Sequence, residues 1–255
     1  MSGCDVRVAA PRTALPGNPW IWRTMFWDAF PNFDVAMLNR GFHVAYIDAG
    51  DTFAAPAALQ IYNDFYAHVT TKYGFSERPA LEGLSRGAFA GYRWAYFNPD
   101  KVGCVYGDAP LCDIYLLERG TPDQKTGIVP SWAWVLESYG HSVDDGPLVI
   151  EGNPIDGLAR LAAANIPIIH VCGDIDTAAV NSENNDIVRE RYLKLGGEFV
   201  LIMKEQCPHH PHGLSDPSMV ADYIVAKCAG GDAAEQAKPR ALKPGTVVTL
   251  PVGAW

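Results

Sequence analysis

The sequence predicts an α/β protein with a mostly parallel, twisted sheet and helices on both faces. Short apolar runs typical of strands alternate with stretches whose apolar residues recur at helical spacing. Two of the runs, 42–47 and 166–172, are apolar almost throughout, which indicates strands buried on both faces. Parallel neighbours need a crossover connection, and the helical stretches supply it.

Strand-like runs in the first part of the chain cover residues 5–9, 19–25, 42–47 and 78–82. The first alternates like an edge strand, and a turn rich in proline and glycine leads into the aromatic second run. Residues 32–40 have helical spacing and end at Gly41. Residues 56–73 predict a helix of about five turns that ends at Gly74. A further helical stretch, 88–97, follows the fourth run.

The second part of the chain continues the alternation, with strand-like runs at 101–106, 166–172 and 198–203. Residues 183–195 predict a helix that two glycines end. The last helix begins near Pro217, because proline suits the first helical position, and ends near residue 228.

Two segments depart from this alternation. Residues 111–165 are too long for a bare connection, so we expect a helical insertion over the edge of the sheet that forms a lid. Residues 229–241 are small, polar and glycine-rich, which predicts a linker. Residues 245–252 are either a strand that returns to the domain or the start of a further unit. The expected organisation is one domain over 1–228, followed by a linker and C-terminal extension over 229–255.

Composition limits the class of protein and of partner. With 255 residues, 48% of them hydrophobic, the chain can bury one large core. A formal net charge of −9 and the lack of a basic stripe argue against nucleic acid or an anionic membrane as a partner. No apolar run of about 18 residues predicts a membrane-spanning helix, and no leader-like segment begins the sequence. As it stands the sequence predicts a cytoplasmic protein, or a periplasmic or secreted one if a leader has been removed.

Six cysteines are widely spaced, at positions 4, 104, 112, 172, 207 and 228. Cys104 and Cys172 fall inside apolar runs, where cysteine usually packs as a small hydrophobic residue. The pattern favours a reducing compartment. In an oxidising one, Cys104 with Cys112, or Cys207 with Cys228, are the candidate pairs.

The most informative motif is Gly83-Leu84-Ser85-Arg86-Gly87, which stands between a strand-like run and a helical stretch. In this context a G-x-S-x-G motif is a nucleophile elbow, in which serine occupies a strained turn and glycine allows strand and helix to approach. Ser85 then presents its hydroxyl at a helix N-terminus that favours developing negative charge. The alternative interpretation is a small residue in an ordinary turn.

A serine at such a turn needs a base and an acid that orients the base. The candidate acid lies in Gly173-Asp174-Ile175-Asp176, and the candidate base in His209-His210-Pro211-His212. Each segment follows a strand-like run. Loops at the C-terminal ends of parallel strands converge on one crevice, so we expect these groups to meet Ser85.

Over residues 5–228 the chain resembles the α/β-hydrolase superfamily, in which serine, acid and histidine follow in this order. It looks most like a bacterial branch of serine esterases associated with carbohydrate processing. The motifs that carry the resemblance are Pro19-Trp20-Ile21-Trp22-Arg23, Gly41-Phe42-His43-Val44, Gly83-Leu84-Ser85-Arg86-Gly87, Gly107-Asp108-Ala109-Pro110, Gly173-Asp174-Ile175-Asp176 and His209-His210-Pro211-His212. The resemblance implies the α/β-hydrolase fold with a helical insertion after the sixth strand of the family, and makes 1–228 the catalytic domain.

The resemblance implies that Ser85 is the nucleophile. It implies Asp176 as the acid, since in the family the acid lies three residues beyond the glycine that ends the seventh strand. Asp108, at the end of the sixth strand of the family, is the alternative acid.

The resemblance leaves the base between two adjacent histidines. The family usually has glycine before its histidine, and here Pro208 stands in that place. Counting back from the last helix admits both His209 and His210. We favour His209, because it is the first residue after the break at Cys207-Pro208, and keep His210 as the alternative catalytic residue.

The implied oxyanion hole combines the backbone amide of Arg86 with one from the loop after the aromatic second strand. The usual His-Gly signature is missing from that loop and Phe26-Trp27 takes its place, so Trp27 is the expected donor and Phe26 the next choice. Trp27, Trp132 and Trp134 are expected to contact the substrate, Trp27 by stacking on a sugar ring.

Three imidazoles and Cys207 within six residues raise the question of a metal site. Their spacing fits no standard zinc pattern. We therefore expect no metal and no other cofactor.

Three functions are compatible with these motifs. The favoured one is a serine esterase that hydrolyses a carboxylic ester through an acyl-enzyme, with a small-molecule ester or an acylated saccharide as substrate. The second is a serine peptidase or amidase on the same triad. The third is a non-catalytic binding module that keeps the fold, and the complete set of triad candidates counts against it.

Overall fold

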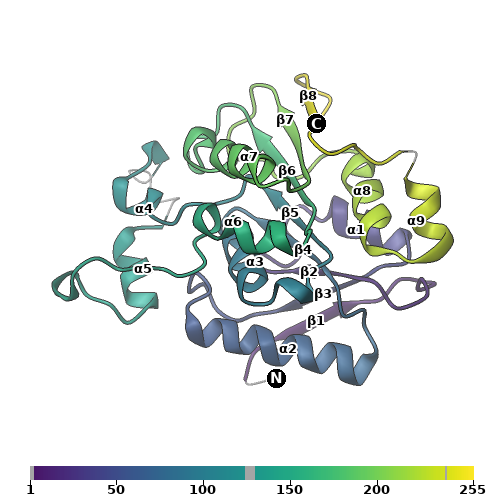
Figure 1. Ribbon diagram of the computed structural model, residues 1–255, viewed down its shortest axis with the longest axis horizontal. Coiled ribbons are helices and arrows are strands. Elements are labelled where there is room, and N and C mark those ends of the chain that lie inside the picture. Colours follow the sequence, from purple (N-terminus) through teal and green to yellow (C-terminus); the bar gives the residue numbers. More distant parts are fainter. Residues whose placement is uncertain (1–2, 124–129, 239) are drawn as a thin grey trace.

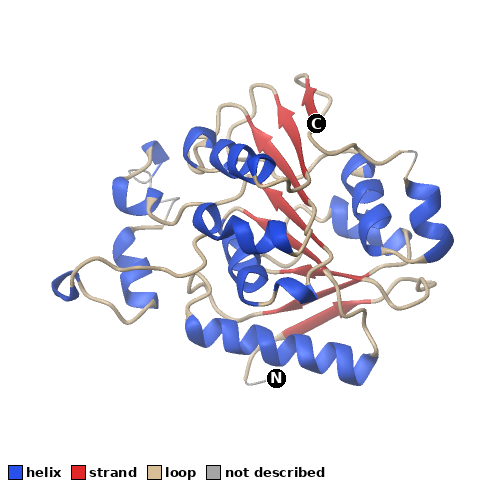
Figure 2. Cartoon of the chain, in the orientation of Figure 1, coloured by secondary structure: helices blue, strands red, loops and turns tan. Residues whose placement is uncertain are grey.

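The computed structural model describes residues 3–123, 130–238 and 240–255 (Figure 1). Across these residues eight strands form one sheet in the order β1-β3-β2-β4-β5-β6-β7-β8. The pair β1 and β3 is antiparallel, and every other pair is parallel. The strands are β1 (Val6–Ala9), β2 (Trp20–Arg23), β3 (His43–Ile47), β4 (Ala80–Leu84), β5 (Cys104–Asp108), β6 (Ile168–Gly173), β7 (Phe199–Lys204) and β8 (Val247–Leu250). The predicted mostly parallel sheet is confirmed, and Figure 2 shows its strands turning progressively from β1 to β8.

Helices cover both faces of the sheet, as predicted (Figure 1). One layer contains α2 (Pro56–Tyr73), α3 (Arg86–Phe97), α6 (Pro154–Ala163) and α7 (Asn185–Lys194). The other contains α1 (Asn32–Asn39), α8 (Ser218–Cys228) and α9 (Gly231–Ala237). Shorter helical pieces are α4 (Leu116–Arg119), α5 (Trp132–Ser138) and the 3-10 turns Pro99–Lys101, Val143–Asp145 and Asn181–Glu183. This two-sided cover explains why the central strands β4, β5 and β6 are buried along their whole length.

Helix α2 matches its predicted bounds because its two ends are set locally. Pro56 occupies the first turn, where the N–H that proline lacks would have no partner within the helix. Gly74 ends the helix in the left-handed region, at φ 64°. The buried residues Tyr62, Phe65 and Val69 lie on its inner face.

Aromatic packing fixes β2 beneath helix α3. Trp20 and Trp22 of β2 are buried, and their ring centroids lie 5.4 Å apart. The Trp22 ring also lies 4.7 Å from that of Trp94, which belongs to α3. Pairs of this kind add to the stabilisation that aromatic burial provides. The loop that follows β2 is therefore held close to the helix that follows Ser85.

The predicted insertion is present after β5, which is the fifth strand along this chain. Helices α4 and α5 lie within the expected range 111–165 and project to one side of the sheet (Figure 1). Residues 124–129 of that range lie outside the described residues. Helix α6, at the end of the range, packs with α3 and α7 and belongs to the cover of the sheet. The insertion is therefore shorter at its C-terminal end than predicted.

The C-terminal segment contacts the domain that precedes it. Residues 231–237 form α9 where the sequence predicted a linker, and Ala237 is buried there. Strand β8 pairs in parallel with β7, with Val247 opposite Leu201. Of the two expectations for 245–252, the returning strand is the one observed. The division of the chain at residue 228 stays a prediction.

Neither cysteine pair considered from the sequence is bonded, since Cys104, Cys112, Cys207 and Cys228 all keep free thiols. Burial raises the pKa of the Cys104 thiol well above its usual value, as expected for a cysteine that packs as an apolar residue. None of the helices in the described part of the chain is long and apolar enough to cross a membrane.

Candidate active site

Ser85 stands at the turn between β4 and α3. Its backbone has φ 51° and ψ −123°, a region that residues with a side chain occupy only under strain. A Cβ added to Gly83 would lie 2.3 Å from the backbone nitrogen of Ala88, so this position requires glycine. The Ser85 amide donates to the carbonyl of Asp108 over 2.8 Å, which ties the turn to β5. The strand–turn–helix geometry predicted from the G-x-S-x-G motif is therefore present.

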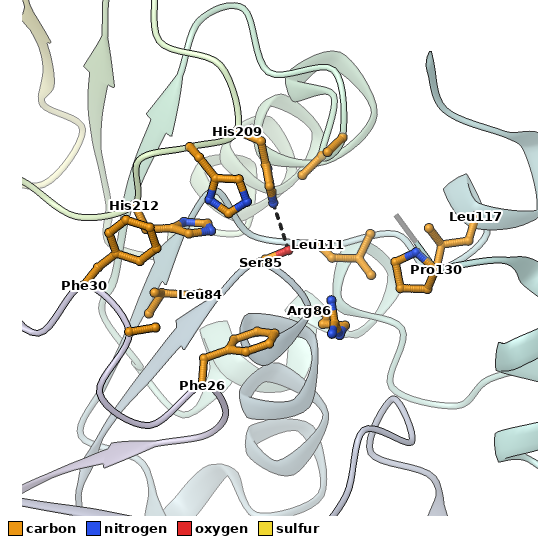
Figure 3. A pocket seen from close by; sticks show the side chains of 14 residues that line it. Phe26, Phe30, Leu84, Ser85, Arg86, Leu111, Leu117, Pro130, His209 and His212 are labelled. Carbon is orange, nitrogen blue, oxygen red and sulfur yellow. Dashed lines mark hydrogen bonds between the residues drawn. The ribbon is translucent and has the colours of Figure 1, made fainter. Parts of the chain in front are cut away.

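Two hydrogen bonds join Ser85, His209 and Asp176. The His209 Nε2 atom lies 3.0 Å from Ser85 Oγ (Figure 3), and His209 Nδ1 lies 2.8 Å from Asp176 Oδ2. Ser85 follows β4, Asp176 follows β6 and His209 follows β7. The C-terminal ends of three parallel strands thus bring together three residues that are far apart in sequence.

Two backbone amides hold the Asp176 carboxylate from behind. Its Oδ1 accepts hydrogen bonds from Ala178 at 2.8 Å and Ala179 at 2.9 Å. Burial alone would raise the pKa of Asp176, but the hydrogen bond and charge of His209 and the two amides outweigh burial and lower the pKa. Asp176 is therefore ionised at neutral pH. From this network we assign the His209 proton to Nδ1, which leaves Nε2 to accept from Ser85.

The structure places the two adjacent histidines differently. His209 reaches Ser85, whereas His210 is exposed and its ring stacks on Phe30, with 6.0 Å between the ring centroids. His210 also lines the cavity that Ser85 faces. The favoured candidate from the sequence is thus the one in position to act on the hydroxyl.

Asp108, the alternative acid, forms a second Asp–His pair with His212. Its Oδ1 lies 2.7 Å from His212 Nδ1, and its Oδ2 accepts from the Tyr106 hydroxyl and the Gly213 amide at 2.8 and 2.9 Å. Burial opposes ionisation of Asp108, but the hydrogen bonds and the charges of His212 and Lys204 lower its pKa. This network, which sequence reasoning missed, anchors the histidine loop to β5. Two features of the sequence could have indicated this network: Asp108 at the end of a strand-like run, and His212 as a third histidine in the loop.

Ser85 and His209 face a cavity of about 210 Å³. Arg86, His210 and His212 contribute the other polar side chains of the lining. The apolar lining consists of Phe26, Ala29, Phe30, Leu84, Leu111, Leu117, Pro130, Ala178 and Ala179 (Figure 3). Three of these, Leu111, Leu117 and Pro130, come from the insertion after β5. The insertion therefore supplies one wall of the cavity, and its action as a lid stays a prediction.

Among the described residues, the cavity lining contains none of the tryptophans expected to contact the substrate. The neighbouring Phe26 lines the cavity and Trp27 does not, so a contact of Trp27 with the substrate stays a prediction. Phe26 has a left-handed backbone, with φ 57°, and the Trp27 ring packs 5.9 Å from that of Tyr46. Trp132 and Trp134 pack on other aromatic side chains near the cavity, and their contribution to substrate binding stays a prediction.

The two backbone donors expected for an oxyanion hole come from the start of α3 and from the loop after β2. Arg86 is the first residue of α3, and the first amides of a helix have no partner within it. In the loop after β2, the Arg23 guanidinium donates to the carbonyls of Phe26 and Ala29 at 3.0 and 2.5 Å, which holds this loop in place. The amides of Arg86 and of Trp27 or Phe26 stay predicted donors.

Arg23 itself is buried between two carboxylates. Its Nη1 lies 2.5 Å from Asp34 and 3.1 Å from Glu82. Burial opposes the charge of Arg23, but Glu82 and Asp34 outweigh burial and raise the pKa of the guanidinium. A buried charge that is paired in this way is costly to displace, so the loop that carries Phe26 is rigidly held.

The Arg86 side chain forms an ion pair with Asp51. Its Nε lies 2.9 and 2.8 Å from the two carboxylate oxygens, and Nη2 lies 2.6 Å from one of them. The guanidinium also lies over the Phe26 ring, 4.8 Å from its centroid. Arg86 therefore closes one side of the cavity with its charge already paired.

No protein-family model and no curated protein sequence matches the chain. Solved structures do match. An acylaminoacyl peptidase from Pyrococcus horikoshii is similar over 91% of this chain and 42% of its own, with 13% identity and a TM-score of 0.62. A Bacteroides ovatus protein classed as a dipeptidyl aminopeptidase IV is similar over 88% of this chain and 33% of its own, with 14% identity and a TM-score of 0.60. The MPT51 protein of Mycobacterium tuberculosis is similar over 81% of this chain and 84% of its own, with 15% identity and a TM-score of 0.56.

These likenesses concern the fold, and together with the strand order they show that the chain has the α/β-hydrolase fold. The chain spans less than half the length of the two peptidase structures, 42% and 33%. One fold hosts many chemistries, so function has to be argued from the site.

Proposed function

We propose that this chain is a serine hydrolase that cleaves a carboxylic ester, with Ser85 as nucleophile, His209 as base and Asp176 as the acid that orients the base. The observation that supports this most is the pair of hydrogen bonds, 3.0 and 2.8 Å long, that links the three side chains. Ser85 lies on a strained turn and faces an imidazole, and the other nitrogen of that imidazole contacts an ionised carboxylate. Packing alone does not require this arrangement, whereas acyl transfer does.

In the first step of the proposed mechanism, Ser85 Oγ attacks the ester carbonyl carbon while His209 Nε2 takes the hydroxyl proton. Asp176 stabilises the imidazolium that forms and keeps its ring in place. The tetrahedral intermediate then breaks its bond to the alcohol oxygen, which receives the proton from His209. The products of this step are the free alcohol and an acyl group on Ser85.

The second step repeats the sequence with water. His209 takes a proton from the water molecule as its oxygen attacks the acyl carbon, and returns the proton to Ser85 Oγ when the acyl–enzyme bond breaks. The acid is released and the free enzyme is restored. Every proton in this scheme moves through His209.

The oxyanion of each tetrahedral intermediate is proposed to accept from the Arg86 amide and from one amide of the loop after β2. A single donor of this kind typically contributes about 3 kcal/mol to the transition state. Phe26 lines the cavity and Trp27 does not, which supports the Phe26 amide as the second donor in place of the Trp27 amide favoured by the sequence.

The cavity supports a short, apolar acyl group. Its volume of about 210 Å³ is below the roughly 300–1,000 Å³ of sites for drug-sized ligands, and the side chains around Ser85 are mostly apolar. Arg86 has its charge paired by Asp51, so recognition of a charged acyl group would first require this pair to open. We further propose that the alcohol part of the ester is a saccharide.

A peptidase or amidase is the second candidate, because two of the similar structures are described as peptidases. The same three side chains would serve, but the leaving amine is a poor leaving group unless His209 protonates it efficiently. The preference for an ester rests on the small apolar cavity, which suits a short acyl group better than a peptide side chain with its flanking backbone.

A substrate panel tests this proposal. We expect p-nitrophenyl acetate and butyrate to be hydrolysed with higher kcat/KM than the octanoate and decanoate esters, because the cavity is too small for long chains. Peptide p-nitroanilides are expected to react far more slowly than either. Acetylated xylo- and cello-oligosaccharides, followed by acetate release, test the saccharide part. Faster cleavage of anilides than of esters would transfer the assignment to a peptidase, and no turnover of any substrate would favour a binding module.

Replacement of the orienting acid separates Asp176 from Asp108. In Asp176→Asn the amide favours the wrong tautomer of His209, so kcat should fall by about 10⁴. Asp108→Asn should lower kcat much less, because the Asp108 side chain contacts His212 and not His209, and its backbone contact with Ser85 is kept in the variant. Turnover numbers on p-nitrophenyl acetate, with thermal melts to check folding, measure both. The reverse ranking would assign the acid to Asp108.

A further inference from the structure

Three imidazoles that line the cavity lie close together, those of His209, His210 and His212. One ring nitrogen of each lies within 4.8 Å of a ring nitrogen of each of the others. The three ring centroids are 4.7 to 5.0 Å apart. No other group of three His, Cys, Asp or Glu side chains comes together in this way in the part of the chain that the structure describes.

Carboxylates hold two of these rings from behind. His209 Nδ1 contacts Asp176 at 2.8 Å, and His212 Nδ1 contacts Asp108 at 2.7 Å. In both rings Nε2 is therefore the nitrogen left to bind a further group. Histidines that bind a metal ion usually have one nitrogen on a carboxylate and the other on the ion. In His209 this second nitrogen now contacts Ser85 Oγ at 3.0 Å, so an ion has to displace the hydroxyl.

Among the described residues, the third ring has no carboxylate behind it and stacks only on Phe30 of the aromatic rings outside the cluster. His210 is exposed, and within the described residues its ring nitrogens have no hydrogen bond. Zn–N bonds of 2.0–2.1 Å place neighbouring ligand atoms about 3.4 Å apart in a tetrahedral site, so the cluster has to contract from its present spacing. Rotation of the exposed His210 side chain can supply much of that contraction.

We propose that His209, His210 and His212 bind one late divalent transition-metal ion, Zn²⁺ in particular, and that this ion inhibits the enzyme. Imidazole nitrogen is a preferred ligand of such ions. The spacing of these residues in the sequence predicted no metal. The structure shows in addition that two carboxylates lie behind the rings, which the spacing could not indicate. Binding takes Nε2 of His209 away from Ser85. The inhibition rests on the proposed function, whereas the binding does not.

Metal titration tests the site directly. Zn²⁺ is titrated into the whole chain in competition with a chromogenic chelator, and Co²⁺ binding is followed by its visible absorption. We expect one ion per chain, with an affinity at least about tenfold lower in His210→Gln, since loss of even a supporting group typically costs 10–100-fold. The control is His68→Gln on α2, where the affinity should match the wild type. No Zn²⁺ binding in the wild type, or equal binding in His210→Gln, would overturn the proposal.

Inhibition is measured separately from binding. Zn²⁺ should slow ester hydrolysis by the wild type, and EDTA should restore it. In His210→Gln, half-maximal inhibition should need a higher Zn²⁺ concentration than in the wild type. Each rate is expressed relative to the zinc-free rate of the same protein. Ser85→Ala should bind Zn²⁺ at least as tightly as the wild type, because the competing hydroxyl is gone. A chain that binds Zn²⁺ through these histidines but hydrolyses no ester would keep the metal site and refute the hydrolase, and an active chain without Zn²⁺ binding would do the opposite.

Discussion

Ser85→Ala is expected to abolish ester hydrolysis while the fold stays intact. Loss of a triad nucleophile typically costs on the order of 10⁶ in turnover. The hydroxyl of Ser85 contacts His209, and the remaining contacts that hold the turn are made by its backbone, which donates to Asp108 and accepts from Ala88 and Leu111. Rates on p-nitrophenyl acetate and a thermal melt measure the two effects.

Ser76→Ala provides the matched control for that variant. Ser76 lies in the loop before β4, where its hydroxyl accepts from the Arg78 amide, and we expect its removal to leave turnover near the wild-type value. Retention by purified Ser85→Ala of more than a small fraction of the wild-type rate would remove Ser85 from the mechanism.

His209→Ala is expected to be about as damaging as Ser85→Ala, because members of a triad act as a unit. The adjacent His210→Ala removes an exposed ring that stacks on Phe30, so it should keep measurable activity and mainly change KM. The two variants are matched, since they delete the same side chain at neighbouring positions of one loop. Kinetics with His210→Ala inactive and His209→Ala active would reverse the assignment.

The double variant Ser85→Ala/His209→Ala gives an independent check. If the two side chains act through one proton transfer, the double variant should be no slower than either single variant. If the loss of turnover in the double variant equalled the product of the two single losses, the side chains would act separately. The 3.0 Å contact between Ser85 Oγ and His209 Nε2 argues against that result.

The fold could be predicted from local signals because they agree with the tertiary arrangement. Runs such as 166–172 are apolar almost throughout, as a strand buried on both faces requires, and Gly74 sets the end of α2 by its left-handed backbone. Gly83 could be interpreted for the same reason, since only glycine fits against the backbone of Ala88. Signals of this type depend on the backbone alone, and the sequence carries them directly.

Other features depend on side chains that are distant in sequence, and the sequence does not carry them. His209 and His210 are adjacent, and what distinguishes them is the contact of His212 with Asp108, 104 positions away, which anchors the loop. The position of Phe26 at the cavity depends on Arg23, whose guanidinium binds carbonyls of the same loop. Glu82, which lies 59 positions from Arg23 in the sequence, in turn holds that guanidinium by an ion pair that no local pattern reports.

Mass spectrometry after reaction with a fluorophosphonate probe tests the central claim most directly, because the probe reacts with a serine only where a base activates it. We expect one adduct per chain, located on Ser85 by peptide mapping, which forms at the same rate as ester hydrolysis is lost. We expect no adduct in His209→Ala on the same timescale. An adduct on another residue that accompanies the loss of activity, or continued labelling of Ser85 in His209→Ala, would contradict the assignment of Ser85 as a nucleophile activated by His209.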